Sequence, residues 1–204
     1  MIQSLIAAAA ASLGHLQRPD PAHNVKMNEA SIHETMTLPE IMVRVAVSQL
    51  GVTEEGGNNR GPRVESYQRA TWLAGTGWAW CAAFVCWCVL QAIQIQGLTP
   101  KGWSRPRTAG AYDFENWALG LKPHGPNSSW RLLPRGSAPR RGDIVTFTWS
   151  HIGICTGYDG SVKRVFTVEG NASREDASDG VRGDGVVAKT HGLSSIRRVI
   201  RFVG

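Results

Sequence analysis

The sequence predicts an α+β fold, with helices first along the chain and an antiparallel β-sheet after them. Two changes along the chain support this class: apolar positions recur at helical spacing before residue 97, and short β-rich runs separated by turn signals follow Gly142. The 204 residues, of which 42% are hydrophobic, suffice for one domain with a substantial core. Helices followed by strands are the order typical of α+β domains.

Residues 1–36 fit this domain poorly. They begin with an Ala-rich apolar stretch, as a signal peptide does. However, the Lys or Arg that a signal peptide carries before this stretch is absent. We expect residues 1–36 to be an N-terminal extension, flexible or a weak targeting segment, and residues 37–204 to form the folded domain. No run reaches the roughly 18 apolar residues of a membrane span, so no spanning segment is expected.

Four helices are expected. Thr37 is a suitable N-cap and Gly51 a suitable stop for the first, and Pro62 opens the second after a polar, glycine-rich loop. The third is an apolar run without Gly or Pro, which predicts a buried helix. The expected helices span residues 38–50, 62–74, 80–93 and 108–120.

The sheet is expected from five short runs after Gly142. They are rich in Val, Ile, Phe and Thr, and turn residues separate them. This spacing favours antiparallel neighbours joined by short connections. The expected strands span residues 143–149, 151–158, 163–170, 185–191 and 196–204.

A basic segment at about residues 97–141 separates the helices from the strands. Residues 101–141 hold eight Lys or Arg and two Asp or Glu, so they account for the whole formal charge of +6. Such a segment indicates contact with a nucleic acid, a wall polymer or a membrane surface, or else a solvated loop. Trp103, Trp117 and Trp130 are interleaved with these charges, as in proteins that stack on nucleic-acid bases.

Four cysteines raise disulfide, metal and catalytic interpretations. Three lie in the predicted buried helix, where Cys81 and Cys88 share a face about 10 Å apart along the axis and Cys86 points away. No single metal ion can gather all three, and a disulfide between helix residues is disfavoured, so no metal site is expected. Cys81 stands at the helix start, where the dipole stabilises a thiolate, and is the candidate nucleophile.

A nucleophilic cysteine needs a histidine base and a polar group that orients it. Of the six histidines, His151 is distinctive because it begins a strand directly after a hydrophobic run, with the small Gly153 on the same face. Glu169 and Asn171 lie two residues apart and share a face if their strand continues between them. Their simpler interpretation is a strand-end charge and a turn residue, and that of His191 is an exposed turn residue.

Four motifs in this order resemble the CHAP family of papain-like cysteine amidases and peptidases, with bacterial and phage members. That family typically shows a W-C-A-A-F-V run at the nucleophile helix, a P-x-x-G-D-I-V strand, a His-(Ile/Val)-Gly strand and an E-G-N strand. The resemblance covers about residues 40–204. Its motifs here are WAWCAAFVCWC at residues 78–88, PRRGDIV at 139–145, HIGICTGY at 151–158 and FTVEGNAS at 166–173.

The resemblance implies a papain-like fold, no cofactor, and hydrolysis of a peptidoglycan amide at the muramoyl–alanine bond or within the stem or bridge peptide. It makes Cys81 the nucleophile and His151 the general base. Glu169 would orient the imidazole, with Asn171 assisting or substituting. Some members bind calcium through acidic residues before the cysteine, but no acid lies between Glu65 and Cys81, so no structural calcium is expected.

The resemblance also implies partners and a place of action. Trp78, Trp80 and Trp149 would flank the site and stack on sugar or peptide. The basic segment would attract anionic wall polymers, and a monomer would act at the cell wall or in an extracellular or periplasmic space. Two alternatives stay open: a basic nucleic-acid-binding protein, and a cell-wall-binding module that kept the fold without turnover.

Overall fold

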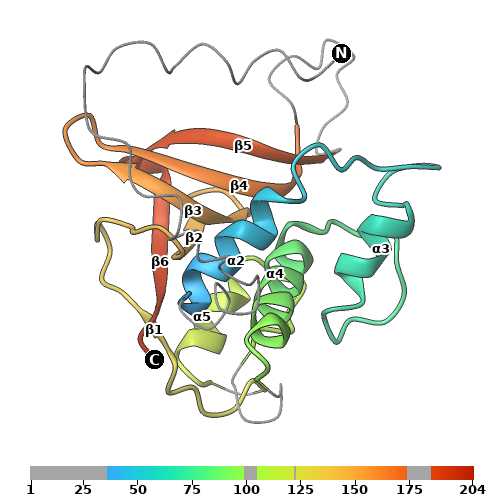
Figure 1. The fold of residues 1–204 in the computed structure, drawn as a ribbon, viewed down its shortest axis with the longest axis horizontal. Coiled ribbons are helices and arrows are strands. Elements are labelled where there is room, and N and C mark those ends of the chain that lie inside the picture. The colour runs from blue at the N-terminus through green and yellow to red at the C-terminus, as the bar shows by residue number, and fades with distance from the viewer. Residues whose placement is uncertain (1–35, 99–104, 122, 174–184) are drawn as a thin grey trace, which may run out of the picture.

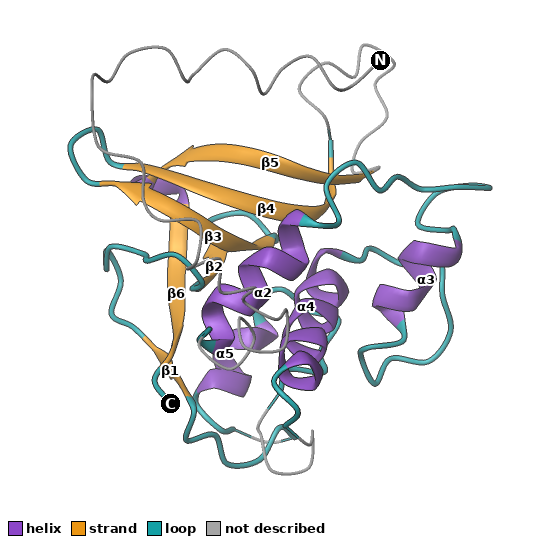
Figure 2. Cartoon of the chain, viewed as in Figure 1, coloured by secondary structure: helices purple, strands orange, loops and turns teal. Residues whose placement is uncertain are grey.

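The protein has the α+β architecture that the sequence predicts, with a helical layer packed on one face of a six-stranded sheet (Figure 1). Figure 2 shows the helices α2 (Leu38–Val47) and α4 (Cys81–Ile95) side by side beneath the sheet. No helix among the described residues is long and apolar enough to cross a membrane. The computed structural model describes residues 36–98, 105–121, 123–173 and 185–204. The expected N-terminal extension, residues 1–36, lies almost wholly outside these ranges.

The first three helices begin where the sequence predicts, to within one residue, whereas the fourth begins at Asp113 and not at residue 108. The first, second and fourth helices are shorter than expected. Glu40 accepts hydrogen bonds from the Thr37 backbone N–H and hydroxyl, which closes a capping box at the start of the first helix. The second helix ends early because the N–H of Trp72 bonds to the Arg107 carbonyl instead of continuing the helix. The helices are α2 (Leu38–Val47), α3 (Pro62–Gln68), α4 (Cys81–Ile95) and α5 (Asp113–Ala118).

The sheet is antiparallel throughout, with strand order β1-β6-β2-β3-β4-β5. All five expected strands are present. A sixth, β1, was not predicted, because its three residues lie inside the basic segment and carry no period of their own. The strands are β1 (Trp130–Leu132), β2 (Ile144–Phe147), β3 (Ile152–Asp159), β4 (Arg164–Ala172), β5 (Gly185–Gly192) and β6 (Ile196–Phe202).

Helix α4 is buried between the other helices and the sheet, as its continuous apolar sequence requires. It approaches β4 at Gly170, where an added Cβ would lie 2.6 Å from Cβ of Phe84 and 2.7 Å from the Trp80 ring. Side chains alternate along β4, so Val168 joins the core beneath the helices whereas Glu169 lies on the opposite face. Glycine at residue 170 therefore lets the helix and the strand come close.

The described part of the basic segment, residues 105–121 and 123–141, belongs to the fold and is not a solvated loop. Phe114 of α5, Trp117 and Trp130 are 0–1% exposed and pack in the core. Buried rings cannot stack on bases, which removes two of the three tryptophans behind the nucleic-acid alternative; Trp103 lies outside the described residues. Charges within this segment are also used internally, since Glu115 pairs with Arg197 at 2.7 Å.

The outer edge of β5 is covered where the strand begins. The Gly51 N–H bonds to the Val186 carbonyl at 3.1 Å, and the Val186 N–H bonds to the Val52 carbonyl at 2.8 Å. Thr53 completes this pairing with an antiparallel bridge to Gly185. The loop that follows α2 is therefore attached to the sheet through its backbone.

Substitution Gly170→Ala tests the close approach of α4 and β4. We expect the free energy of unfolding to fall by about 1–3 kcal/mol, because the new methyl group overlaps Phe84 and Trp80. Gly160→Ala is the matched control, since its Cβ would make only an ordinary 3.5 Å contact with Tyr158. Urea unfolding of both variants measures the difference. Equal stabilities would show that the helix is not held against the strand at this point.

Candidate active site

Cys81 is the first residue of α4, as the sequence predicts, and is 8% exposed. The turn before it is fixed by the buried Gln68, whose Nε2 donates to the carbonyls of Trp78 at 2.7 Å and Asn59 at 3.2 Å. Trp80 is fixed as well, because its Nε1 donates to Glu54 at 2.8 Å. The thiol therefore stands at a helix N-terminus, where the helix dipole favours negative charge.

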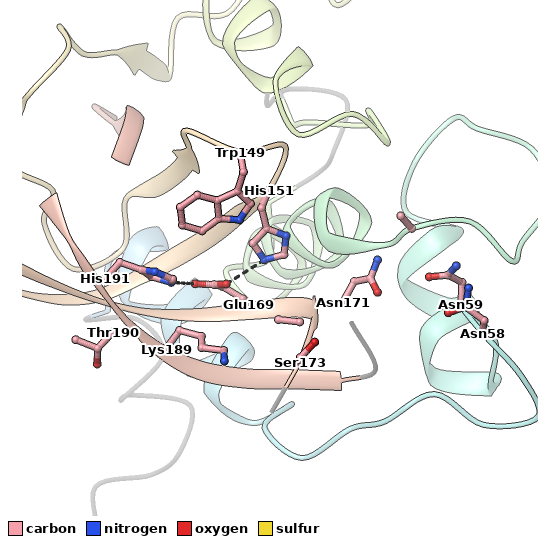
Figure 3. A pocket seen from close by; sticks show the side chains of 12 residues that line it. Asn58, Asn59, Trp149, His151, Glu169, Asn171, Ser173, Lys189, Thr190 and His191 are labelled. Atoms are coloured by element: carbon pink, nitrogen blue, oxygen red, sulfur yellow. Dashed lines mark hydrogen bonds and ion pairs between the residues drawn. The ribbon is translucent and has the colours of Figure 1, made fainter. Parts of the chain in front are cut away.

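His151 and Glu169 meet at the edge of the sheet (Figure 3). His151 lies in the short loop between β2 and β3, and its Nε2 is 2.9 Å from Oε2 of Glu169. Its ring also hydrogen-bonds to the Cys81 side chain, for which Nδ1 is the remaining nitrogen. The three side chains thus form a continuous chain from thiol to imidazole to carboxylate.

The environment of His151 favours the protonated imidazole. Burial acts to lower its pKa, but hydrogen bonds to Cys81 and Glu169 and the negative charge available on both outweigh burial. The result is a pKa raised from the ordinary 6.5 to about 9. The His151 imidazole therefore holds a proton at neutral pH, next to the Cys81 side chain.

Glu169 is 2% exposed and charged. Burial acts to raise its pKa, but hydrogen bonds from His151 and His191 outweigh burial and lower the pKa to about 2. Gly153 makes room for this side chain, since a Cβ there would lie 2.7 Å from Cγ of Glu169. Gly153, which lies close to His151 in the sequence, thus leaves room for the Glu169 carboxylate that contacts His151.

A cavity of about 700 Å³ opens beside this chain of residues. Trp149 lines it and is 46% exposed, stacked on Phe147 at 4.8 Å. The expectation for Trp80 is wrong, because its ring is 0% exposed and packs on Tyr67 in the core. Trp78 packs partly buried against the core and does not line the cavity. The cavity is lined by Asn58, Asn59, Ala79, Trp149, His151, Glu169, Asn171, Ala172, Ser173, Lys189, Thr190 and His191.

Asn171 lines the same cavity as Glu169, but the strand between the two residues is not regular, so simple alternation does not explain the position of Asn171. β4 is irregular between Glu169 and Ala172, and Asn171 has a left-handed backbone with φ of 54°. Asparagine tolerates this conformation better than most residues. Glu169, and not Asn171, is the residue whose carboxylate lies against the His151 ring at 2.9 Å.

His191 is the site residue that sequence reasoning missed. The simpler interpretation was an exposed turn, yet its side chain is only 15% exposed and its Nε2 is 2.7 Å from Oε1 of Glu169. One pattern in the sequence could have identified His191. It lies two residues after Lys189 in β5, so both side chains lie on the same face of the strand, and in the structure this is the face that carries Glu169. The register of β5 against β4 decides which residues meet, and the sequence does not fix that register.

The other thiols lie away from this arrangement. Cys86, Cys88 and Cys155 are 0% exposed, and burial raises the pKa of each. No group of three or more His, Cys, Asp or Glu side chains suited to a metal ion occurs in the part of the chain that the structure describes.

An α+β fold that brings a helix-start thiol to an imidazole and a carboxylate at the edge of a sheet defines the papain-like class of proteins. Residues 73–171 match the family model of the CHAP domain, so the chain carries a CHAP domain and is a hydrolase of the amidase or peptidase type. The match extends from just before the turn at Cys81 to Asn171. Comparisons with curated proteins and with solved structures gave no match.

The raised pKa of His151 predicts how Cys81 reacts at different pH. We expect the rate of Cys81 alkylation by iodoacetamide to change near pH 9, where His151 loses its proton and the neighbouring thiolate loses its counter-charge. Glu169→Gln removes a charge that favours imidazolium, so this inflection should move toward the ordinary value of 6.5. Rates are measured by mass spectrometry of the Cys81 peptide.

Asn171→Ala is the comparison variant for this measurement. Because the Asn171 amide carries no charge, its removal should move the inflection less than Glu169→Gln does. A larger movement with Asn171→Ala would mean that the asparagine, and not the carboxylate, supports the imidazole.

Proposed function

We propose that the protein hydrolyses an amide bond of peptidoglycan through an acyl-enzyme formed on Cys81. The observation that carries this proposal is the hydrogen-bonded chain of Cys81, His151 and Glu169 beside a cavity of about 700 Å³. CHAP domains are peptidoglycan hydrolases of the amidase or peptidase type, which supplies the substrate class. The amide is the muramoyl–alanine bond or one within the stem or bridge peptide.

The first half of the reaction uses the thiolate and the imidazolium together. The Cys81 sulfur attacks the amide carbonyl carbon, and the oxyanion lies at the N-terminus of α4, within reach of the Cys81 backbone N–H. Collapse of this tetrahedral intermediate breaks the C–N bond. His151 gives its proton to the departing amine, and Glu169 holds the ring in place while its charge changes.

The second half returns the enzyme to its starting state. His151, now neutral, takes a proton from water, and the resulting hydroxide attacks the thioester carbonyl. The C–S bond breaks, a carboxylic acid leaves, and the Cys81 sulfur is released beside His151, which already carries the proton taken from water. Glu169 remains ionised throughout, because its pKa of about 2 lies far below the working pH.

The exposed basic surface suits an anionic wall but does not border the cavity. Arg140 and Arg141 precede the first residue of β2, whereas His151 follows the last. These two arginines therefore stand at the opposite end of β2 from His151, and we assign them to long-range attraction toward wall polymers. The place of action in this proposal is the cell wall, where the substrate is found.

Removal of the nucleophile tests the proposed function directly. Cys81→Ala should abolish the release of soluble fragments from purified cell walls, because the other three thiols are fully buried and cannot replace it as nucleophile. Cys155→Ala, which removes a buried sulfur elsewhere in the sheet, should keep the activity. Mass spectrometry of the fragments identifies the new amine and carboxylic acid and hence the bond. Undiminished release by Cys81→Ala would exclude a cysteine hydrolase.

The role of Trp149 in binding is tested with a matched tryptophan. Trp149→Ala should raise KM about three- to tenfold, because a stacked ring at a binding site stabilises a bound sugar or peptide by a small amount. Trp72→Ala is the control, since Trp72 is also 46% exposed but stacks on His124 away from the cavity. An equal KM for the two variants would remove Trp149 from the binding site.

A further inference from the structure

Glu169 has two carboxylate oxygens, and different groups hold them. Oε2 faces His151, whereas Oε1 lies 2.7 Å from Nε2 of His191 and accepts the Thr167 hydroxyl. The two histidines therefore lie on opposite oxygens of one buried carboxylate, as the dashed lines in Figure 3 show. The reaction described above uses only the His151 side.

The His191 ring is itself held in place by aromatic packing. It lies 4.5 Å from the ring of Phe147 and 5.7 Å from that of Trp149. Phe147 is fully buried and also stacks on His151 at 5.7 Å. One aromatic ring thus contacts both histidines, and the position of each is fixed relative to the other.

From this geometry we infer that His191 is a positioning residue, which donates from Nε2 to Oε1 of Glu169 and thereby keeps Oε2 directed at the imidazole of His151. Its meaning for catalysis rests on the proposed function. Without this donor the carboxylate has Thr167 alone on Oε1, and rotation about its side chain can turn Oε2 away from His151.

Other titratable groups are near enough to be considered. His151 comes from the loop before β3, Cys81 from α4, and Lys189 from β5, where it lines the same cavity. Only the two histidines and Thr167 hydrogen-bond to the Glu169 carboxylate among the contacts found in the described residues. The hydrogen-bonded route from His191 to Cys81 therefore passes through Glu169 and His151, and the other route is packing through Phe147.

Two substitutions separate hydrogen bonding from packing. His191→Phe keeps a ring against Phe147 and Trp149 but cannot donate, whereas His191→Gln keeps an N–H donor without the ring. The measured quantity is the pH of the inflection in Cys81 alkylation by iodoacetamide, which reports the proton on His151. We expect His191→Phe to lower it by about one pH unit and His191→Gln to leave it nearly unchanged.

This experiment needs no peptidoglycan, so its result is independent of the proposed substrate. An unmoved inflection in His191→Phe would mean that Thr167 alone holds Oε1 and would overturn the inference, even if walls are still cleaved. A larger shift in His191→Gln than in His191→Phe would show that the ring acts by packing, and would overturn it as well. Failure of wall cleavage with the expected shifts would overturn the function alone.

The unmodified protein supplies a second measurement, should either variant fail to fold. Long-range ¹H–¹⁵N NMR of the histidine rings identifies the nitrogen that carries the proton. We expect a proton on Nε2 of His191 at neutral pH. A His191 ring protonated on Nδ1 alone could not donate to Glu169, and this result would overturn the inference without any substitution.

Discussion

The buried negative charge of Glu169 is the constraint on which this site depends. A carboxylate that is 2% exposed is costly unless hydrogen-bond donors surround it. Its partners come from three places in the chain: His151 before β3, Thr167 within β4 and His191 in β5. The pairing of β3, β4 and β5 therefore does two things: it forms the backbone hydrogen bonds of the sheet, and it brings hydrogen-bond donors to the Glu169 carboxylate.

The site also requires two layers of the fold to meet at a set distance. Cys81 belongs to the helical layer, whereas Glu169 lies on the sheet face turned away from it. His151 lies at the edge between them and reaches both. Glycine at residue 170 lets α4 lie directly on β4, so the E-G-N motif supplies a carboxylate, a close contact and a residue with left-handed backbone in three consecutive positions.

Much of this arrangement was predictable from local patterns. The helix start at Cys81 and the strand that follows His151 are encoded in a few neighbouring residues each, and the order of helices and strands gave the class. Contacts set by strand register were not predictable, which is why His191 looked like a turn residue. The tryptophans were ambiguous for a related reason, because tertiary packing decides that Trp80 is buried and Trp149 is exposed.

The backbone pairing of residues 51–53 with the start of β5 has a consequence for how a peptide can approach. β5 is the last strand of the sheet, and an open edge would capture an extended peptide as an additional strand. At the start of β5 that edge is already occupied by the protein's own chain. An extended peptide therefore cannot be added as a further strand at Gly185 and Val186, because residues 51–53 already take the backbone hydrogen bonds there.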